Sequence, residues 1–365
     1  MNILFYTPVN FRCRDIESLA KKYRENGHTI FLISQCEAGA LQNSFLKLNA
    51  IVTPMIVPKG NSLVRLYKSI QLIISFCKRH KIDLLFSHLE PTNFVSVIAQ
   101  YFITTRVVIY RHHVDLAKLQ RFDNSITYKL TYLLARNIIS VSEEGKRWMV
   151  EKERIDPKKI EVINLGYDFS LYGSANADEV IAIKEKYGVA VTLITVGSLN
   201  QFKRPELSIK TLYELRQEGI DATLLFLGTG ELEEALKKLV NELGLNGKVF
   251  FLGYKENILD YLTAADMLLH PSISESSCVV VKESGLVQKP VVVCKGVGDF
   301  DNYLENDRNA IVVNRDDFVN QSVVHIKKML SNREQYRILG VNLHEEIINR
   351  FSIDRVFNNY SKFSV

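Results

Sequence analysis

Two glutamates, Glu275 and Glu283, are the residues whose types and spacing point most directly to chemistry in this 365-residue chain. They follow a short apolar run, Met267–His270, so Glu275 is expected near a strand end and Glu283 two turns along the next helix. The expected helix start, Ser277–Val279, leaves backbone N–H groups unpaired and carries the positive end of the helix dipole, which suits a diphosphate. An amphipathic surface helix is the alternative, but the apolar run Val279–Val281 argues against it, because a buried, unpaired carboxylate is costly.

Histidines follow two other apolar runs. His112 and His113 come just after Val107–Tyr110, and His88 comes directly after Leu84–Ser87. An imidazole at a strand end can hydrogen-bond a hydroxyl group or stabilise developing charge. For the pair at 112 and 113 a purely structural role is equally open, and His88 is a weaker candidate for contact with a substrate.

The elements that must position these residues are short apolar strands alternating with helical patterns. Such runs predict strands buried on both faces, as in a parallel sheet between two helix layers. The chain holds two βαβ series in tandem, and each crossover is expected to be right-handed. The first series has strands at Ile3–Tyr6, Thr29–Ile33, Leu84–Ser87 and Val107–Tyr110, and the second at Thr192–Val196, Thr223–Leu227, Lys248–Leu252, Met267–His270 and Pro290–Cys294.

The fold class is therefore α/β, with two doubly wound parallel-sheet domains facing a central cleft. The junction is expected around Asp168–Ala177, where small and polar residues cluster. This gives an N-terminal domain over residues 1–168, a C-terminal domain over 169–348, and a final helix over 349–365 that crosses back to the first domain. Ligands of such sheets bind at the carboxyl ends of the strands. Two facing sheets would each contribute one ligand-binding edge, which is expected of a two-substrate enzyme, although the fold alone does not fix the function.

Charge and cysteine usage narrow the class of protein. The net charge is +5, but residues 1–170 carry +9 and residues 171–365 carry −4. The basic half indicates contact with phosphates or an anionic membrane, or simply a solvated surface, whereas no nucleic-acid-binding motif occurs. Five scattered cysteines predict free thiols in a reducing compartment. No secretory signal or membrane-spanning run is recognised, so a cytoplasmic protein, at most peripheral at the inner face of the membrane, is expected.

One helical pattern bears on that membrane contact. The stretch Asn61–Asp83 places Leu63, Leu66, Ile70, Ile73 and Ile74 on one side and basic residues nearby. It is typical of a helix that lies on an anionic membrane surface carrying a lipid-linked acceptor. An ordinary helix packed on the core explains the same pattern and is the preferred interpretation.

Several stretches together resemble glycosyltransferase family 4, over most of the chain. The glutamate pair behind a strand is the most specific of them. The resemblance implies the GT-B fold and transfer from a nucleotide-sugar with retention of configuration. The matching stretches are ESLAKKYRENGHTIFLIS, IISVSEEGKRWMVEKERIDPKKIEVINLGYD, TVGSLNQFKRPELSI, LLFLGTGELEEALKKL, VFFLGYKENILDYLTAADMLLHPS and ESSCVVVKESGLVQKPVVV.

The resemblance also implies roles for individual residues. Glu275 would bind hydroxyls of the donor sugar, Glu283 the ribose hydroxyls, and Lys203 the pyrophosphate, whose developing charge a cation stabilises. His112 would lie near the reacting sugar, with His113 beside it, and His88 would contact the acceptor. The remaining donor-binding candidates are Gly197, Ser198, Gly253, Tyr254, Ser277, Cys278 and Val279.

Three departures from the family pattern qualify these roles. Ser198 stands where arginine is common, and Ser276-Ser277-Cys278 replaces a frequent Gly-Phe-Gly. The loop after the first strand lacks a glycine pair, so its backbone cannot approach a phosphate as closely. Arg12 or Arg14 is the candidate for supplying a phosphate or acceptor contact instead, although both could be plain solvated arginines.

Two further glycine and aspartate motifs receive structural interpretations. Gly228-Thr229-Gly230 resembles a phosphate loop but is expected to form a tight turn into a helix at Glu231. Asp299-Phe-Asp301 could bind a divalent metal, yet it lies near a helix start where aspartate caps well. No metal or other cofactor is expected.

The resemblance thus implies a retaining, metal-independent glycosyltransferase that uses a nucleotide-sugar, with a UDP-sugar favoured. The acceptor would be a glycan or a lipid-linked glycan in surface polysaccharide synthesis. Two alternatives stay open: a sugar-nucleotide or glycan-binding protein that has lost activity, and a nucleotide-sugar epimerase on the same fold. A nicotinamide dehydrogenase is disfavoured because no Gly-x-Gly-x-x-Gly follows the first strand.

Overall fold

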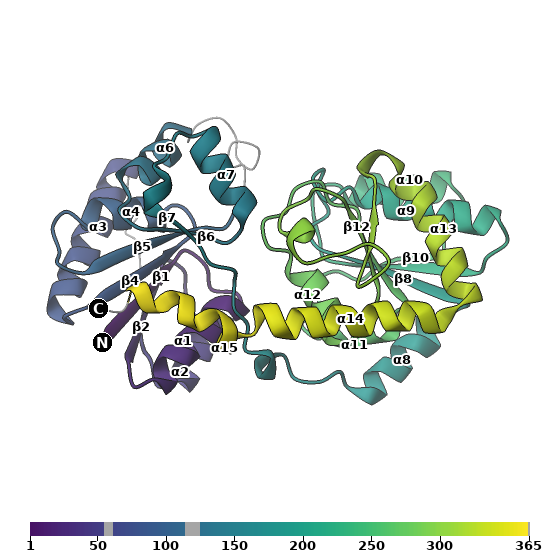
Figure 1. The fold of residues 1–365 in the computed structure, drawn as a ribbon, viewed down its shortest axis with the longest axis horizontal. Coiled ribbons are helices and arrows are strands. Elements are labelled where there is room, and N and C mark those ends of the chain that lie inside the picture. The colour runs from purple at the N-terminus through teal and green to yellow at the C-terminus, as the bar shows by residue number, and fades with distance from the viewer. Residues whose placement is uncertain (55–60, 114–124, 364–365) are drawn as a thin grey trace. The chain divides into compact units, whose positions relative to one another are not determined.

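The chain folds into two compact units in the computed structural model, which describes all residues except 55–60, 114–124 and 364–365 (Figure 1). Unit 1 comprises Met1–Tyr172 together with Phe351–Val365, and unit 2 comprises Gly173–Arg350. The junctions expected at residues 168 and 348 lie within a few residues of these limits. Each unit contains a parallel sheet flanked by helices, so the predicted α/β class with two parallel-sheet domains is confirmed.

Unit 1 is built on a seven-stranded parallel sheet in the order β3-β2-β1-β4-β5-β6-β7. Its strands are β1 (Asn2–Thr7), β2 (Thr29–Ser34), β3 (Ile51–Pro54), β4 (Leu84–His88), β5 (Arg106–Arg111), β6 (Ile138–Ser140) and β7 (Ile160–Val162). Its helices include α1 (Arg14–Glu25), α2 (Ala40–Lys47), α3 (Ser62–Arg79), α4 (Thr92–Ala99), α6 (Ser125–Leu134), α7 (Glu143–Glu151) and α15 (Ile353–Val356). The central strands are buried along almost their whole length, as their unbroken apolar runs predicted.

Unit 2 has a six-stranded parallel sheet in the order β10-β9-β8-β11-β12-β13. Its strands are β8 (Val191–Val196), β9 (Ala222–Leu227), β10 (Val249–Phe251), β11 (Met267–His270), β12 (Val291–Cys294) and β13 (Ile311–Val313). Its helices are α8 (Ala177–Tyr187), α9 (Pro205–Gln217), α10 (Glu233–Glu242), α11 (Ile258–Ala264), α12 (Val279–Leu286), α13 (Phe318–Ser331) and α14 (Arg333–Phe351). Strand order reverses between β8 and β11, and a doubly wound sheet binds ligands at this point.

The C-terminal segment packs on unit 1. Tyr167 N–H donates to Phe351 O at 2.8 Å, and Ile353 N–H donates back to Tyr167 O at 2.9 Å. Further along, the Tyr360 and Tyr110 hydroxyls are 3.1 Å apart in a buried hydrogen bond. The core of unit 1 therefore includes residues from both ends of the chain.

Helix α3 faces the core with Ser69, Ile73, Ile74 and Cys77. Leu63, which the sequence placed on the same apolar side, is instead 75% exposed, because it lies in the first turn, beyond the part of the helix that packs on the core. No helix among the described residues combines the length and the apolar character needed to cross a membrane.

Candidate active site

Lys203, Glu275 and His270 meet in unit 2. The Lys203 ammonium and the His270 Nε2 both contact Glu275 Oε1, the latter at 2.7 Å. Glu275 and Lys203 are partly exposed, whereas His270 is buried at the end of β11. A carboxylate is thus held between two basic groups at the carboxyl edge of the sheet.

Two loops bring these groups together across 72 residues of sequence. The Ile273 N–H donates to Phe202 O at 2.9 Å, and Arg204 Nε donates to Pro271 O at 2.9 Å. Arg204 itself has φ of 47°, a left-handed conformation that is unfavourable for a side chain and that ends the loop just before α9. These hydrogen bonds fix Lys203 opposite Glu275.

The electrostatics of this cluster favour its charged forms. Burial alone would raise the pKa of the Glu275 carboxyl, but Lys203 and His270 outweigh it and hold that pKa well below its usual range. Burial lowers the pKa of His270, but contacts with Cys278 and Glu275 prevail and raise it to about 9. At neutral pH the three groups therefore carry two positive charges and one negative charge. An anionic diphosphate would meet a net positive site.

The loop that leads into α12 rests on a buried ion pair. Lys282 Nζ donates to Ser277 Oγ at 3.0 Å, to Cys278 O at 3.2 Å and to Asp299 Oδ2 at 3.2 Å. Asp299 makes no capping hydrogen bond, so the capping role expected for it was wrong; its buried carboxylate pairs with Lys282 instead, because a buried charge without a partner is costly. Val279 is 38% exposed rather than buried, because it faces outward in the first turn of α12.

Other donor-side candidates surround a hollow of about 290 Å³ in unit 2, whose lining includes Gly197, Ser198 and Tyr254. Gly228 also lines it, and a Cβ there would lie 2.2 Å from Gly197 O, so the glycine permits two strand ends to approach closely. The Gly228-Thr229-Gly230 turn leads to α10, which begins at Glu233 rather than at Glu231.

Gly253 and Glu283, the remaining donor-side candidates in unit 2, lie after β10 and on α12. Gly253 has φ of 68° and its carbonyl accepts from Gly228 N–H at 2.8 Å, so it lies beside the hollow. Glu283 is half-buried on α12, the helix that the sequence predicted for it.

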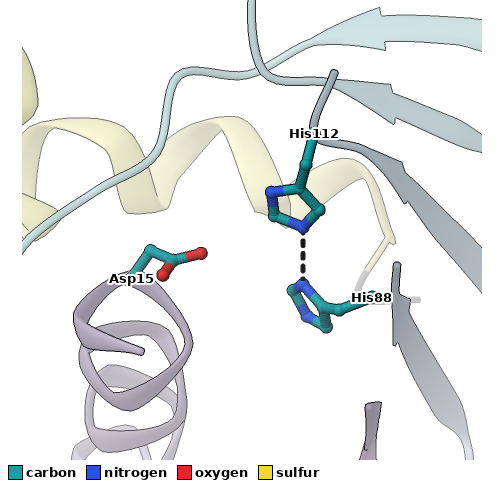
Figure 2. A group of neighbouring side chains, drawn as sticks. All are labelled: Asp15, His88 and His112. Carbon is teal, nitrogen blue, oxygen red and sulfur yellow. Dashed lines mark hydrogen bonds between the residues drawn. The ribbon is translucent and has the colours of Figure 1, made fainter. Parts of the chain in front are cut away.

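In unit 1, His88 and His112 face one another, with Asp15 beside them (Figure 2). His88 Nδ1 and His112 Nε2 are 3.2 Å apart. His88 is 1% exposed and stacks on Tyr110, with ring centroids 4.1 Å apart, so it is not placed to touch an acceptor itself; the expectation of direct contact is corrected on this ground.

The ionisation of this histidine cluster is set mainly by burial. Burial lowers the pKa of His88 well below its usual range. Burial, together with the nearby His113, also lowers the pKa of His112 to about 3. It raises the pKa of Asp15 to about 6. Both imidazoles are therefore neutral at neutral pH, and Asp15 is mostly ionised.

Arg12 and Arg14, the arginine candidates after the first strand, both lie near the Glu17 carboxylate. Arg14 pairs with Glu17 at 3.1 Å, and Arg12 lies 3.8 Å from the same side chain. Arg12 is 44% exposed and retains access to solvent, whereas Arg14 is mostly covered. His113 is exposed, and its carbonyl accepts from Arg111 Nε at 2.6 Å.

Sequence reasoning missed three residues at these sites: Asp15, His270 and Lys282. His270 ends the predicted strand Met267–His270, so its place at a strand end was a usable signal. Nothing local distinguished Asp15 from an ordinary acidic residue in the first turn of a helix. Lys282 lies within an apolar stretch and gave no sign of its buried partner.

Two family profiles match the chain. The profile described as Glycosyltransferase Family 4 matches residues 14–171, and that described as Glycosyl transferases group 1 matches residues 176–345. One similar protein is the N-acetylgalactosamine-N,N'-diacetylbacillosaminyl-diphospho-undecaprenol 4-alpha-N-acetylgalactosaminyltransferase of Campylobacter jejuni. It is 28% identical over 65% of this chain and 65% of its own length, just under two thirds. Another is the UDP-Gal:alpha-D-GlcNAc-diphosphoundecaprenol alpha-1,3-galactosyltransferase of Escherichia coli, 21% identical over 80% of this chain and 77% of its own.

Solved structures extend the likeness over the whole fold. HepE of Anabaena in complex with UDP and glucose superimposes with a TM-score of 0.84 at 18% identity, covering 99% of this chain and 98% of that one. WaaG, a glycosyltransferase involved in lipopolysaccharide biosynthesis, gives 0.73 at 15% identity, covering 100% and 99%. At such identities the likeness shows the fold alone.

Proposed function

The chain belongs to glycosyltransferase family 4 and has its GT-B fold, and we propose that it transfers a sugar from a UDP-sugar with retention of configuration. The observation that carries the proposal is Glu275 held between Lys203 and His270 at the switch point of unit 2. This cluster supplies the two chemistries a nucleotide-sugar needs, cations for a diphosphate and a carboxylate for hydroxyls.

On the donor side, Lys203 and the N–H groups at the start of α12 would hold the diphosphate, and Glu275 would bind hydroxyls of the transferred sugar. Glu283 would hold the ribose, and the base would enter the hollow beside Gly197, Ser198 and Tyr254. The complexes of HepE with UDP and with UDP-glucose support a uridine donor. Lys203 and the His270 imidazolium provide the positive charge, so no metal is required in this proposal.

In the reaction, an acceptor hydroxyl would attack the anomeric carbon from the face that the diphosphate leaves. The C–O bond to the acceptor forms as the bond to the diphosphate breaks, and a leaving phosphate oxygen takes the hydroxyl proton. Lys203 would stabilise the charge on that leaving group. His112 would hydrogen-bond a sugar hydroxyl near the reacting carbon.

The acceptor is proposed to be a glycan or a lipid-linked glycan in surface polysaccharide synthesis. The names of the two relatives above describe transfer to diphospho-undecaprenol-linked sugars, which supports this class. With a lipid-linked acceptor, the enzyme is proposed to work at the inner face of the membrane. The start of α3 suits such contact, because Leu63 and Tyr67 are 75% and 63% exposed beside Arg65 and Lys68.

A panel of nucleotide-sugars, each assayed for release of free nucleotide, tests the proposal. One donor should be turned over, and Lys203→Ala and Glu275→Ala should each lower kcat/KM at least about 100-fold, because the first removes the cation proposed to stabilise the leaving diphosphate and the second removes the carboxylate proposed to bind the donor sugar. Lys237→Ala and Glu234→Ala remove a matched lysine–glutamate pair on the surface of α10 and should leave turnover unchanged.

Product anomers seen by NMR would establish retention, and an inverted product would contradict it. Tight binding of a nucleotide-sugar without turnover, with lipid-linked or glycan acceptors present, would favour a binding protein. That outcome has a physical basis in Ser198 and the Ser276-Ser277-Cys278 loop, which depart from the family pattern.

A further inference from the structure

Three elements of unit 1 bring Asp15, His88 and His112 together. Asp15 lies in the first turn of α1, His88 ends β4, and His112 follows β5 directly (Figure 2). A carboxylate oxygen of Asp15 lies within 4.8 Å of a nitrogen of each imidazole. Asp15 forms no ion pair with any described residue, and Arg12 and Arg14 both face Glu17 instead.

The geometry of the two histidines is that of a hydrogen bond rather than of a metal site. Their ring centroids are 5.4 Å apart, close to the largest separation that a 3.2 Å contact between nitrogens allows, so the nitrogens point almost directly at one another. An ion on the line between them would lie about 1.6 Å from each nitrogen, shorter than the roughly 2.0–2.1 Å of a zinc–nitrogen bond, and an ion off that line would meet lone pairs that do not point at it. Two neutral imidazoles that share one proton fit the distance instead.

Burial decides which histidine donates. His88 Nε2 is buried and has no hydrogen-bond partner among the described residues. If it carried the proton, an N–H donor would be left unsatisfied, which folded proteins largely avoid. His88 therefore carries its proton on Nδ1 and donates to His112 Nε2. His112 is left with its proton on Nδ1.

We propose that Asp15 and His112 together bind one hydroxyl of the sugar acceptor, and that His88 is a positioning residue that fixes the His112 tautomer. This rests on the proposed function. The His112 nitrogen that does not face His88 lies on the side of Asp15 (Figure 2), so a hydroxyl oxygen placed between them can accept from the His112 N–H and donate to the Asp15 carboxylate. Asp15 and His112 are half-buried, so both are accessible to a ligand.

Imidazole tautomers can be read directly by long-range ¹H–¹⁵N NMR of the full chain, with His112→Asn used to assign the signals. His112 should be protonated on Nδ1 in the native protein. His88→Leu should remove this preference, and His88→Asn, whose amide can replace the Nδ1–H donor, should restore it. Because this readout needs no turnover, it stays informative even if the donor panel fails.

Ligand binding is tested with methyl α-D-galactoside and methyl N-acetyl-α-D-glucosaminide as probes. At least one should shift the His112 Nδ1–H signal, and Asp15→Asn should weaken that binding about tenfold. Once an acceptor is known, Asp15→Asn should raise its KM while release of nucleotide to water is retained. A His112 protonated on Nε2, or no shift with either glycoside up to its solubility, would overturn the proposal. Sharp shifts of both histidines on adding Zn²⁺ would assign a metal site instead.

Discussion

Glu275 is the residue on which the donor site depends, and its two basic partners contribute differently. Lys203 is partly exposed and can turn from the carboxylate to a phosphate, whereas His270 is 2% exposed and stays in place. When a diphosphate draws Lys203 away, His270 keeps Glu275 ionised. The imidazolium thus preserves the carboxylate form that accepts sugar hydroxyls.

Removal of the His270 charge should therefore weaken donor use. His270→Gln retains a hydrogen-bond donor near the Nε2 position but is neutral, and kcat/KM for the donor should fall about tenfold or more. His325→Gln, a half-buried histidine of α13 that contacts Tyr336, is the matched control and should be unaffected. Equal kinetics for His270→Gln and the native chain would contradict a role for the charge.

The pH dependence follows from the same group. The pKa of His270 is about 9 in the folded chain and about 6.5 when unfolded, so protonation stabilises the fold. That contribution is complete below about pH 6.5 and is lost as pH rises through 9. Turnover and Tm of the native chain should both fall over this range, and His270→Gln should show neither fall. If turnover and Tm of the variant fell over the same pH range as those of the native chain, the fall would belong to another titrating group.

At the scale of elements, the loop after β12 supports the loop that carries Glu275. Gly298 has φ of 57°, and a Cβ there would lie 2.8–2.9 Å from backbone and side-chain atoms of Glu275. Gly296 has φ of 68° in the same loop, but a Cβ there would meet only the far ends of two side chains, the nearer being Arg315 at 3.2 Å. The two glycines share the same conformational requirement and differ in what they touch.

This difference can be measured. Alanine at either position is strained by about 1–3 kcal/mol, so both variants should lose a few degrees of Tm. Only Gly298→Ala must also displace Glu275, and its kcat/KM should fall about tenfold while that of Gly296→Ala stays near native. Similar kinetics for both variants would mean that this contact does not position the carboxylate.

At the scale of the whole molecule, unbroken apolar runs predicted the architecture because parallel strands covered on both faces need them. Strands β3, β6, β7 and β13 were missed, and three of these have only three residues, too few for a period to show. The cluster of Glu275 with Lys203 and His270 could not be predicted without the strand order. Its two loops meet because β8 and β11, the strands that they follow, are neighbours in the sheet. The Lys282–Asp299 pair could not be predicted, because recognising it requires knowing that both side chains are buried, and the sequence does not show the burial of single residues.

The net charge differs between the two halves of the chain, and this difference bears on whether the acceptor is bound at a membrane surface. Residues 1–170 carry +9, while the rest of the chain carries −4. In unit 1 the exposed start of α3 adds apolar side chains to that charge. Basic and apolar groups together bind an anionic bilayer more strongly than either does alone.

We therefore expect the full chain to co-sediment with vesicles containing anionic lipid, but not with neutral vesicles. Arg65→Gln with Lys68→Gln should weaken the binding about 30-fold, at about 1 kcal/mol for each cation, and added salt should weaken that of the native chain. Leu63→Asp should also weaken it, whereas Ile181→Asp, at a 54% exposed position in unit 2, should not. Binding that changes neither with salt nor with the α3 substitutions would show that another part of the chain contacts the membrane. Absence of binding to either kind of vesicle would contradict the membrane contact and indicate that the enzyme binds its acceptor in solution.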